Sequence, residues 1–526
     1  MRGRWLRMWS EDEQLASFWP ILGLALLAAL VLVLPNSVVL TKYVNDVLIF
    51  LDGAYRLNLG QVPNRDFHTA LGPINFILPA IAARITGTLG TAMSVGMALL
   101  ILLLAPAIAH IISSRMRPVI GLPFAAFLIL LLAVPMNLGE SIFDLSFGMF
   151  YNRIGWVALA VLVVMYLRPS APRRRQALLD GAAATLLTLV LLYTKASYGV
   201  VAVGFLVFLT VLDARQRSWV AGALATVILA ALLIEAFWRG TANHVADLAA
   251  AAHVSGSKTA EEFVDFLFRN FADYVLFTLV TGLALWRTRR VRDLLFFGFC
   301  AGAGLLLISQ NYQNWGIITL HAGMAVAAEL LVRTMTPEDM LRRFSAPAAA
   351  PFLLVLLLLP TITHCAAALG LHAALATTRA GEEFTFPNYR GLRLAFVWQR
   401  LDHTSNARYL ATLREGAALL ERMEPKPKGV FVLDFVAPFS SLAGLVPPRG
   451  DSAWQHWGRN VNEFAFIPPE QMFGDVEVVM EPKVAIEGVT GDNLRRIYGP
   501  YIDREYRLIA ESPDWKLYRR TRPAGA

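Results

Sequence analysis

Acidic and basic side chains gather in one loop that follows the first long apolar run of the chain. Asp46 comes a few residues after that run, and the string Arg65-Asp66-Phe67-His68 follows. A carboxylate held at the end of an apolar helix can take a proton from a hydroxyl group as a general base. Arg65, Asp66 and His68 form a second cluster that can bind a phosphate or share a proton. Asp46 and Asp66 are therefore the candidate catalytic residues, and the alternative is that all of these are solvated loop charges.

A second acidic loop, residues 137–153, contains Glu140 and Asp144. Carboxylate oxygens are ligands that Mg²⁺ and Mn²⁺ prefer, so these two residues, together with Asp46, are candidates for holding such an ion. The same carboxylates are candidates for contacting an acceptor molecule. The sequence lacks the cysteine and histidine spacing of a zinc site. We expect no definite metal centre, and Mg²⁺ or Mn²⁺ is the open alternative.

Three basic residues, Arg153, Lys195 and Arg239, lie at the ends of apolar runs. An ionisable group beside hydrocarbon is costly and marks a candidate functional site, and a lipid phosphate is its natural partner. A long basic side chain that only extends to the membrane surface produces the same pattern. The full set of expected substrate-binding residues is Arg65, His68, Glu140, Asp144, Arg153, Lys195 and Arg239.

The composition indicates the kind of protein that must position these residues. Of 526 residues, 56% are hydrophobic and 16% are charged, against about 25% charged in a soluble globular chain. These values exclude a single soluble enzyme and a disordered protein. The two cysteines, Cys300 and Cys365, lie in apolar stretches, which excludes a disulfide scaffold. The net charge of +8 comes from basic clusters between apolar runs rather than from one basic face, so we expect no nucleic acid partner.

Apolar runs long enough to cross a bilayer predict about eleven transmembrane helices. They span about 17–41, 91–112, 119–136, 154–168, 178–194, 198–213, 218–238, 272–287, 293–310, 315–333 and 347–369. The short loops on one side are rich in arginine, which places them and the N-terminus in the cytoplasm. A further apolar run, 71–87, would reverse this arrangement if it spanned the membrane, so we expect it to be an interfacial or re-entrant helix. The arginines are Arg2, Arg4, Arg7, Arg115, Arg117, Arg168, Arg173, Arg174, Arg175, Arg215, Arg217, Arg287, Arg289, Arg290, Arg292, Arg333, Arg342 and Arg343.

The predicted fold is a polytopic α-helical membrane protein with a C-terminal soluble α/β domain on the outer face. Its parts are a cytoplasmic tail (1–16), a transmembrane module (17–369) with outer loops 42–90, 137–153 and 239–271, and a periplasmic or extracellular domain (370–526). In that domain we expect strands at 429–434 and 475–480, a helix at 405–423 and a hairpin over 506–520. The stretch after Asp46 predicts an amphipathic helix along the membrane surface.

The C-terminal domain contains one aromatic string that stands out. Trp454, His456 and Trp457, with Arg459, would form a stacking surface for a carbohydrate. A well-packed loop of a small domain explains the same residues, and we expect no catalytic role for them.

The first loop resembles the GT-C superfamily of membrane glycosyltransferases, which use polyprenyl-phosphate sugars and include the aminoarabinose transferases and protein mannosyltransferases. The family has an acidic residue after the first span, a surface helix, a glycine and a Pro-x-x-Asp-type loop that ends at a proline. Two positions depart from it: Val47 stands where the family often has Glu, and Gly72 where it often has Pro. The matching residues, in order, are Asp46, Gly60, Pro63, Arg65-Asp66-Phe67-His68 and Gly72-Pro73.

The resemblance implies an inverting glycosyltransferase that moves a sugar from a polyprenyl-phosphate donor to a glycan, lipid or protein acceptor, with Asp46 as general base. The chain has no Walker motif, since the nearest string, residues 256–259, lacks a glycine directly before Lys258. The alternatives are a transporter or flippase and a non-catalytic assembly partner for lipid-linked saccharides. Transport sites lie near the membrane midplane, whereas here the acidic residues gather in outer loops. The Ala-, Leu- and Arg-rich composition favours a bacterial inner membrane, with membrane lipids as neighbours.

Overall fold

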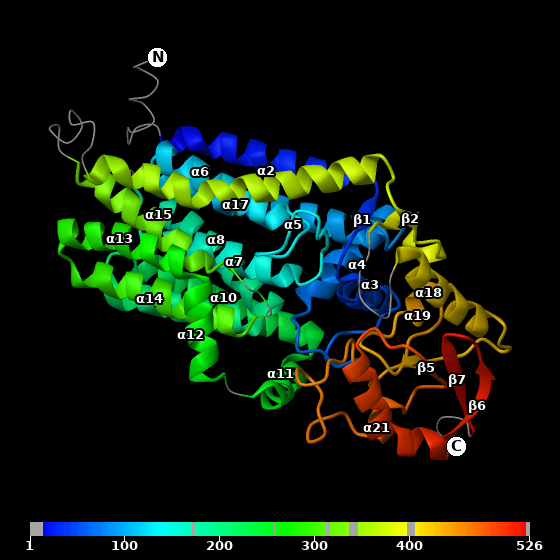
Figure 1. Ribbon diagram of the computed structural model, residues 1–526. Coiled ribbons are helices and arrows are strands. Elements are labelled where there is room, and N and C mark those ends of the chain that lie inside the picture. Colours follow the sequence, from blue (N-terminus) through cyan, green and yellow to red (C-terminus); the bar gives the residue numbers. More distant parts are fainter. Residues whose placement is uncertain are drawn as a thin grey trace.

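The computed structural model describes residues 14–170, 174–256, 258–311, 313, 315–335, 346–396 and 405–521. Long helices lie side by side in a bundle, and the C-terminal domain packs against one end of it (Figure 1). Residues 1–13 of the predicted cytoplasmic tail are not among the described residues, and neither are Arg173, Arg342 and Arg343. The architecture confirms a helical membrane protein with a C-terminal region that contains small sheets.

Each of the predicted transmembrane runs contains a helix. Five of these helices, α5, α8, α10, α14 and α17, are long and apolar enough to cross a membrane, as expected of a multi-pass membrane protein. The bounds are α2 (Phe18–Val33), α5 (Ala92–Arg115), α6 (Pro118–Ala133), α7 (Phe150–Val164), α8 (Gln176–Thr194), α9 (Ala196–Leu212), α10 (Arg217–Trp238), α13 (Phe271–Thr288), α14 (Val291–Ser309), α15 (Ile318–Arg333) and α17 (Ala346–Thr377).

Two ends of the predicted spans differ from the structure. The first run does not continue as a helix to residue 41, because Pro35 and Asn36, which has φ of 50°, follow the end of α2. Residues Val38–Leu40 instead form β1, which pairs in parallel with β3 (Leu392–Leu394); β2 (Glu382–Glu383) pairs with the other edge of β3. At the other boundary, α17 continues past residue 369 to Thr377. The small sheet of β1, β3 and β2 therefore joins the chain after the first span to the chain after the last span.

Two helices of the first loop, α3 (Val44–Asn58) and α4 (Ile74–Thr86), lie between the bundle and the C-terminal domain (Figure 1). They cross closely at Gly53, where an added Cβ would be 2.2 Å from the ring of Phe76. With 13 residues, α4 is about 20 Å long, which is shorter than the ~30 Å hydrocarbon core. This length fits the interfacial or re-entrant helix expected at 71–87.

The helix predicted after Asp46 is present, but its polar face does not lie in the membrane surface as expected. Asn45, Asp52 and Arg56 on that face are all buried. The Asn45 amide oxygen accepts a hydrogen bond from the Tyr409 hydroxyl of the C-terminal domain at 2.7 Å. The polar face of α3 is thus a contact surface for the C-terminal domain.

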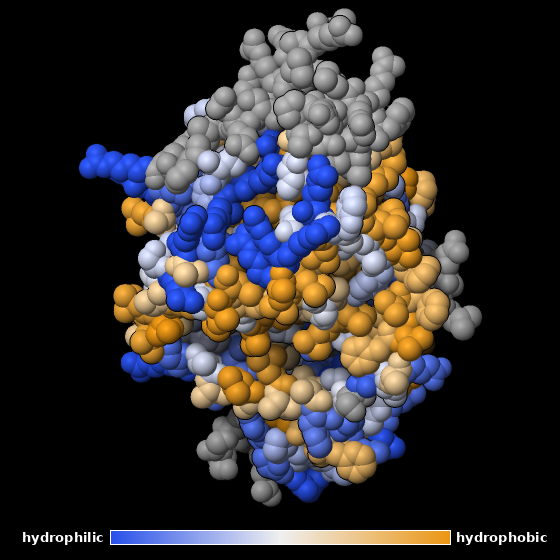
Figure 2. Space-filling view, turned by 90° about the vertical axis from the view of Figure 1, so that its left-hand side faces the viewer, coloured by the Kyte–Doolittle hydropathy of each residue, from blue (hydrophilic) through white to orange (hydrophobic). Residues whose placement is uncertain are grey.

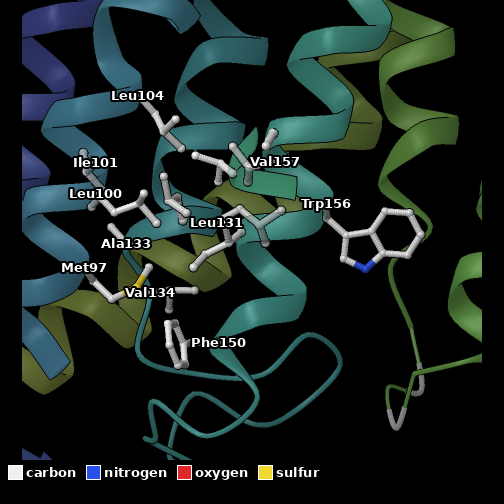
Figure 3. Packing of buried hydrophobic residues seen from close by; sticks show 14 of the residues in the cluster. Met97, Leu100, Ile101, Leu104, Leu131, Ala133, Val134, Phe150, Trp156 and Val157 are labelled. Carbon is white, nitrogen blue, oxygen red and sulfur yellow. The ribbon is translucent and has the colours of Figure 1, made fainter. Parts of the chain in front are cut away.

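Apolar side chains fill the centre of the bundle. Figure 3 shows side chains of α5, α6 and α7 packed together, among them Leu100, Leu131 and Val157. Trp156 lies apart from this group, and its indole Nε1–H donates to the Gln313 side-chain oxygen at 3.2 Å. These contacts fix α7 in the core. Because α7 directly follows the second loop, they also fix the end of that loop.

The end of the bundle away from the C-terminal domain carries the arginine-rich turns. Viewed from that end, a hydrophilic patch is bordered by hydrophobic surface (Figure 2). Some of these arginines are bound to buried acids; the Arg117 guanidinium lies 2.9 Å from the Glu329 carboxylate. Such pairs fix the helix ends relative to one another.

The C-terminal domain confirms the predicted secondary structure of its sequence. Its sheet has the order β4-β5-β7-β6, with β4 and β5 parallel and the other pairs antiparallel. The predicted hairpin is β6 and β7, and the predicted helix is α18. The bounds are α18 (Asn406–Glu421), β4 (Val430–Val432), α19 (Phe439–Ala443), α20 (Pro469–Met472), β5 (Val478–Pro482), α21 (Gly488–Glu505), β6 (Tyr506–Glu511) and β7 (Trp515–Arg520). Loop 239–271 also forms helices, α11 (Thr241–Ser255) and α12 (Ala260–Arg269).

Candidate functional site

Asp46 lies in the first turn of α3, half-buried at the end of the bundle nearest the C-terminal domain. The positive end of the helix dipole favours a carboxylate at this position. The second loop passes directly over it at Gly148, where an added Cβ would lie 3.2 Å from the Asp46 Cβ and 3.0 Å from the Tyr43 Cβ. The absence of a side chain at Gly148 therefore allows the two loops to meet.

Asp46 lines a cavity of about 380 Å³. Four parts of the chain form its walls: the start of α3, Leu71 just before α4, Met149 and Tyr151 at the start of α7, and the C-terminal domain. The C-terminal domain contributes Trp454, His456, Trp457 and Arg459. The aromatic string that the sequence singled out therefore lies at the same cavity as the candidate base, although the two are some four hundred residues apart in the chain.

Lys195, between α8 and α9, is a half-buried basic residue beside Tyr151, which lines this cavity. Its ammonium donates to the side-chain oxygen of Asn311, lies 3.4 Å from that of Asn152, and sits 5.5 Å from the centre of the Tyr151 ring. Among the described residues, no carboxylate lies within ion-pair distance of it. Burial, reinforced by the positive charge of Arg459, lowers the pKa of Lys195 to about 7.

Asp46, Lys195 and Arg459 belong to one electrostatic cluster around Tyr151. Asp46 and Arg459 both act on the Tyr151 hydroxyl, and Arg459 acts on Lys195. Asp46, Tyr151 and Arg459 line one cavity, and the Lys195 ammonium lies 5.5 Å from the centre of the Tyr151 ring, so a proton acceptor and basic groups that can bind an anion are close together.

Asp66, the other candidate catalytic residue, does not line this cavity. Its carboxylate accepts a hydrogen bond from the Val62 backbone N–H at 2.7 Å and pairs with the Arg449 guanidinium at 2.9 Å. These contacts shape the first loop and attach it to the C-terminal domain. Asp66 is therefore not brought together with Asp46, and its catalytic role stays a prediction.

His68 and Arg65 also lie away from Asp46. The His68 Nδ1 is 2.7 Å from the Asp247 carboxylate in α11, and its Nε2 is 2.7 Å from the Gln471 side-chain nitrogen. The hydrogen bond to Asp247 raises the pKa of His68, although burial opposes the shift. Arg65 is exposed. Asp247 was not predicted as a site residue, because a single acid in an Ala-rich helix gives no signal.

Glu140 and Asp144 come together around Lys42. The Lys42 ammonium lies 2.6 Å from Glu140 and 3.2 Å from Asp144, and the Tyr43 hydroxyl donates to Glu140 at 2.7 Å. Two carboxylates bound to a lysine are not arranged as ligands of a divalent ion together with Asp46. Within the described part of the chain, no group of three or more His, Cys, Asp or Glu side chains is placed to hold a metal ion.

Arg153 and Arg239 do not join Lys195. The Arg153 guanidinium is buried and donates to the Met136 carbonyl at 2.9 Å, whereas its neighbour Asn152 faces Lys195. Arg239 ends α10 with φ of 52° and is exposed. Of these three basic residues, Lys195 contacts a residue of the cavity wall, Tyr151, whose ring centre is 5.5 Å from the Lys195 ammonium.

One buried cluster of charged side chains could not be predicted from the sequence. Arg56 of α3 donates to Asp52 one turn earlier and to both carboxylate oxygens of Asp451 in the C-terminal domain. Backbone bonds support the junction, since the Gly450 N–H donates to the Asp66 carbonyl at 2.7 Å and the His68 N–H to the Asp451 carbonyl at 2.7 Å. The spacing of Asp52 and Arg56 is that of a helical ion pair, but nothing in the sequence points to Asp451.

Comparisons with known proteins find a likeness in structure but none in sequence. No family model matches the chain, and no curated protein matches it in sequence. Among solved structures, the apo state of ArnT from Cupriavidus metallidurans aligns with 96% of this chain and 98% of its own, at 13% identity and a TM-score of 0.46. That protein is of the aminoarabinose transferase type that the first loop resembles. At this identity and TM-score, the likeness assigns no substrate, partner or site residue to this chain.

Proposed function

We propose that the chain is an integral membrane glycosyltransferase that moves a sugar from a polyprenyl-phosphate donor to an acceptor on the outer face of the membrane. The observation that supports it most is the position of Asp46 at a cavity between the helix bundle and the C-terminal domain, which Arg459 also lines and whose wall residue Tyr151 lies beside Lys195. A proton acceptor and an anion-binding group at one cavity are what this reaction requires.

In the proposed reaction the donor phosphate lies near Lys195, whose half-buried ammonium has no carboxylate partner among the described residues. The acceptor hydroxyl oxygen attacks the anomeric carbon of the sugar. Asp46 takes the hydroxyl proton. The bond from the anomeric carbon to the phosphate oxygen breaks, and its electron pair leaves with the lipid phosphate. A single displacement inverts the anomeric configuration, and no nucleotide is consumed.

The protein is proposed to lie in a bacterial inner membrane, with its N-terminus in the cytoplasm and the C-terminal domain on the periplasmic or extracellular side. The arginine-rich turn between α13 and α14 lies at the end of the bundle away from that domain (Figure 1), and Figure 2 shows a hydrophilic patch at the same end, which agrees with the positive-inside rule. The polar groups of the Asp46 cavity lie at the opposite end, where a transport site near the midplane is not expected.

The test is transfer from a polyprenyl-phosphate sugar in membranes that contain Asp46→Asn. Because a general base contributes about 10²- to 10⁴-fold to a rate, the variant should lose transfer by that factor while it still folds. Asp144→Asn is the matched control, since Asp144 is bound to Lys42 and is not at the cavity. Full transfer activity in a well-folded Asp46→Asn protein would contradict the assignment.

A further inference from the structure

One wall of the Asp46 cavity is made by a short aromatic segment of the C-terminal domain. Trp454, His456 and Trp457 all line the cavity and are only half-buried. The centre of the Phe435 ring lies 5.8 Å from those of Trp454 and His456. Phe435, Trp454 and His456 thus contact one another in the wall, and Trp457 lines the same cavity.

The segment is held in one shape by its own polar contacts. The Asn460 side chain accepts from the His456 N–H at 2.7 Å and donates to the Trp454 carbonyl at 2.9 Å. The Trp457 N–H donates to the Thr490 hydroxyl at 3.1 Å. A binding surface fixed in advance loses less conformational entropy when a ligand binds.

Polar atoms are interspersed among these rings. The indole Nε1–H of Trp454 is buried and has no hydrogen-bond partner among the described residues. The Nδ1 of His456 lies 3.1 Å from the Trp457 carbonyl, so this nitrogen carries the hydrogen and Nε2 is a free acceptor. Burial and the charge of Arg459 lower the pKa of His456, which keeps the ring neutral at neutral pH. The wall therefore offers aromatic faces, one donor and one acceptor.

We propose that Trp454, His456 and Trp457 form the acceptor subsite and that the acceptor is a carbohydrate. This inference rests on the proposed function and names the acceptor class for it. Sugar rings present C–H faces that pack on aromatic rings, and hydroxyl groups that pair with donors and acceptors. A lipid tail would need no polar atoms in the wall. A cavity of about 380 Å³ is at the small end of the ~300–1,000 Å³ range of ligand sites, which suits a terminal saccharide rather than a protein segment.

The experiment measures glycan binding by the full-length chain in lipid nanodiscs on an array of immobilised oligosaccharides. The wild type should retain a defined group of glycans, and Trp454→Ala and Trp457→Ala should each weaken retention about tenfold or more. Phe464→Ala is the matched control, because Phe464 is an exposed aromatic residue of the same domain that does not line the cavity.

Thermal unfolding of each variant separates lost contacts from lost structure, and Trp457→Phe should recover part of the binding because it keeps an aromatic face. The proposal is overturned if the wild type retains no glycan, or if well-folded Trp454→Ala and Trp457→Ala proteins retain the same glycans equally well. It is also overturned if Trp454→Ala and Trp457→Ala leave Asp46-dependent transfer onto a lipid or protein unchanged. That outcome would not contradict the proposed function. Glycan binding that needs Trp454 and Trp457, without any transfer from a polyprenyl-phosphate donor, supports the subsite and contradicts the proposed function.

Discussion

Arg56 and Asp451 form a two-armed ion pair between α3 and the C-terminal domain, with both nitrogen-to-oxygen distances at 2.8 Å. Both side chains are almost fully buried. Burial alone would lower the pKa of Arg56, but the carboxylates of Asp451 and Asp52 raise it above its ordinary value. The pair joins the helix that carries Asp46 to the segment that carries Trp454, and so it holds two walls of the cavity together.

Replacement of Arg56 by Met should destabilise this junction strongly. It leaves the carboxylates of Asp451 and Asp52 buried without their cation, and breaking a buried pair in this way costs about 3–5 kcal/mol. We expect a lower thermal midpoint and loss of transfer even though Asp46 is intact. Differential scanning fluorimetry and a transfer assay on the same preparation measure both effects.

Two variants serve as controls for Arg56→Met. Arg56→Lys keeps the charge but not the two-armed geometry, so it should give an intermediate effect. Arg84→Met changes an exposed arginine on the neighbouring helix α4 whose guanidinium donates to Asn58, and it should behave like the wild type. Equal stability of the Met and wild-type proteins at position 56 would contradict the structural role of the pair.

The helical part of the fold could be predicted from the sequence because it depends on local composition. Apolar runs of about twenty residues have few alternatives to a helix in a membrane, and every predicted run contains one. The ends were less predictable: Pro35 and Asn36 stop α2 early, and the strand at Val38–Leu40 exists only because residues 392–394 pair with it. Such partners are set by the tertiary fold.

The site could be predicted only in part, for the same reason. The order of residues after the first span predicts Asp46 as a site residue, and the position of an ionisable residue beside hydrocarbon predicts Lys195; both stay predictions, although the fold places Asp46 at the cavity and Lys195 beside Tyr151. Asp66 looked equivalent to Asp46 in sequence, but its partner Arg449 belongs to the distant C-terminal domain. The aromatic segment at 454–457 was visible as a string of residues, and only the fold brings it to the cavity.

The ion pair between Asp66 and Arg449 should contribute little, in contrast to that of Arg56. The Arg449 side chain is 61% exposed, and exposed pairs contribute about 0–1 kcal/mol. Arg449→Ala should therefore keep the wild-type melting temperature and transfer rate within error. If Arg449→Ala or Asp66→Asn abolished transfer without loss of stability, Asp66 would regain its place as a catalytic candidate.

The contact between the first loop and α11 should depend on pH through His68. Its pKa is raised in the folded protein by Asp247, so the stabilisation is fully present below the unfolded value of about 6.5 and is lost as pH rises through the folded value. Hydrogen exchange of the α11 backbone, corrected for the intrinsic pH dependence of exchange, should show weaker protection above that pH. In His68→Gln the corrected protection should not change with pH, and a wild-type protein with pH-independent protection would contradict the prediction.

Binding of a lipid phosphate should weaken as pH rises above the pKa of Lys195. That pKa is lowered to about 7 by burial and by Arg459, so Lys195 is charged below pH 7 and loses its proton above it. If the ammonium holds the phosphate, affinity for polyprenyl phosphate should fall toward tenfold per pH unit on the alkaline side. Lys195→Arg should bind without this fall, because arginine stays charged, and Lys195→Met should bind weakly at every pH.

The phosphate titrates equally in all three proteins, so the difference between the wild type and Lys195→Arg reports the lysine alone. A wild-type profile that matches Lys195→Arg would remove Lys195 from the phosphate site.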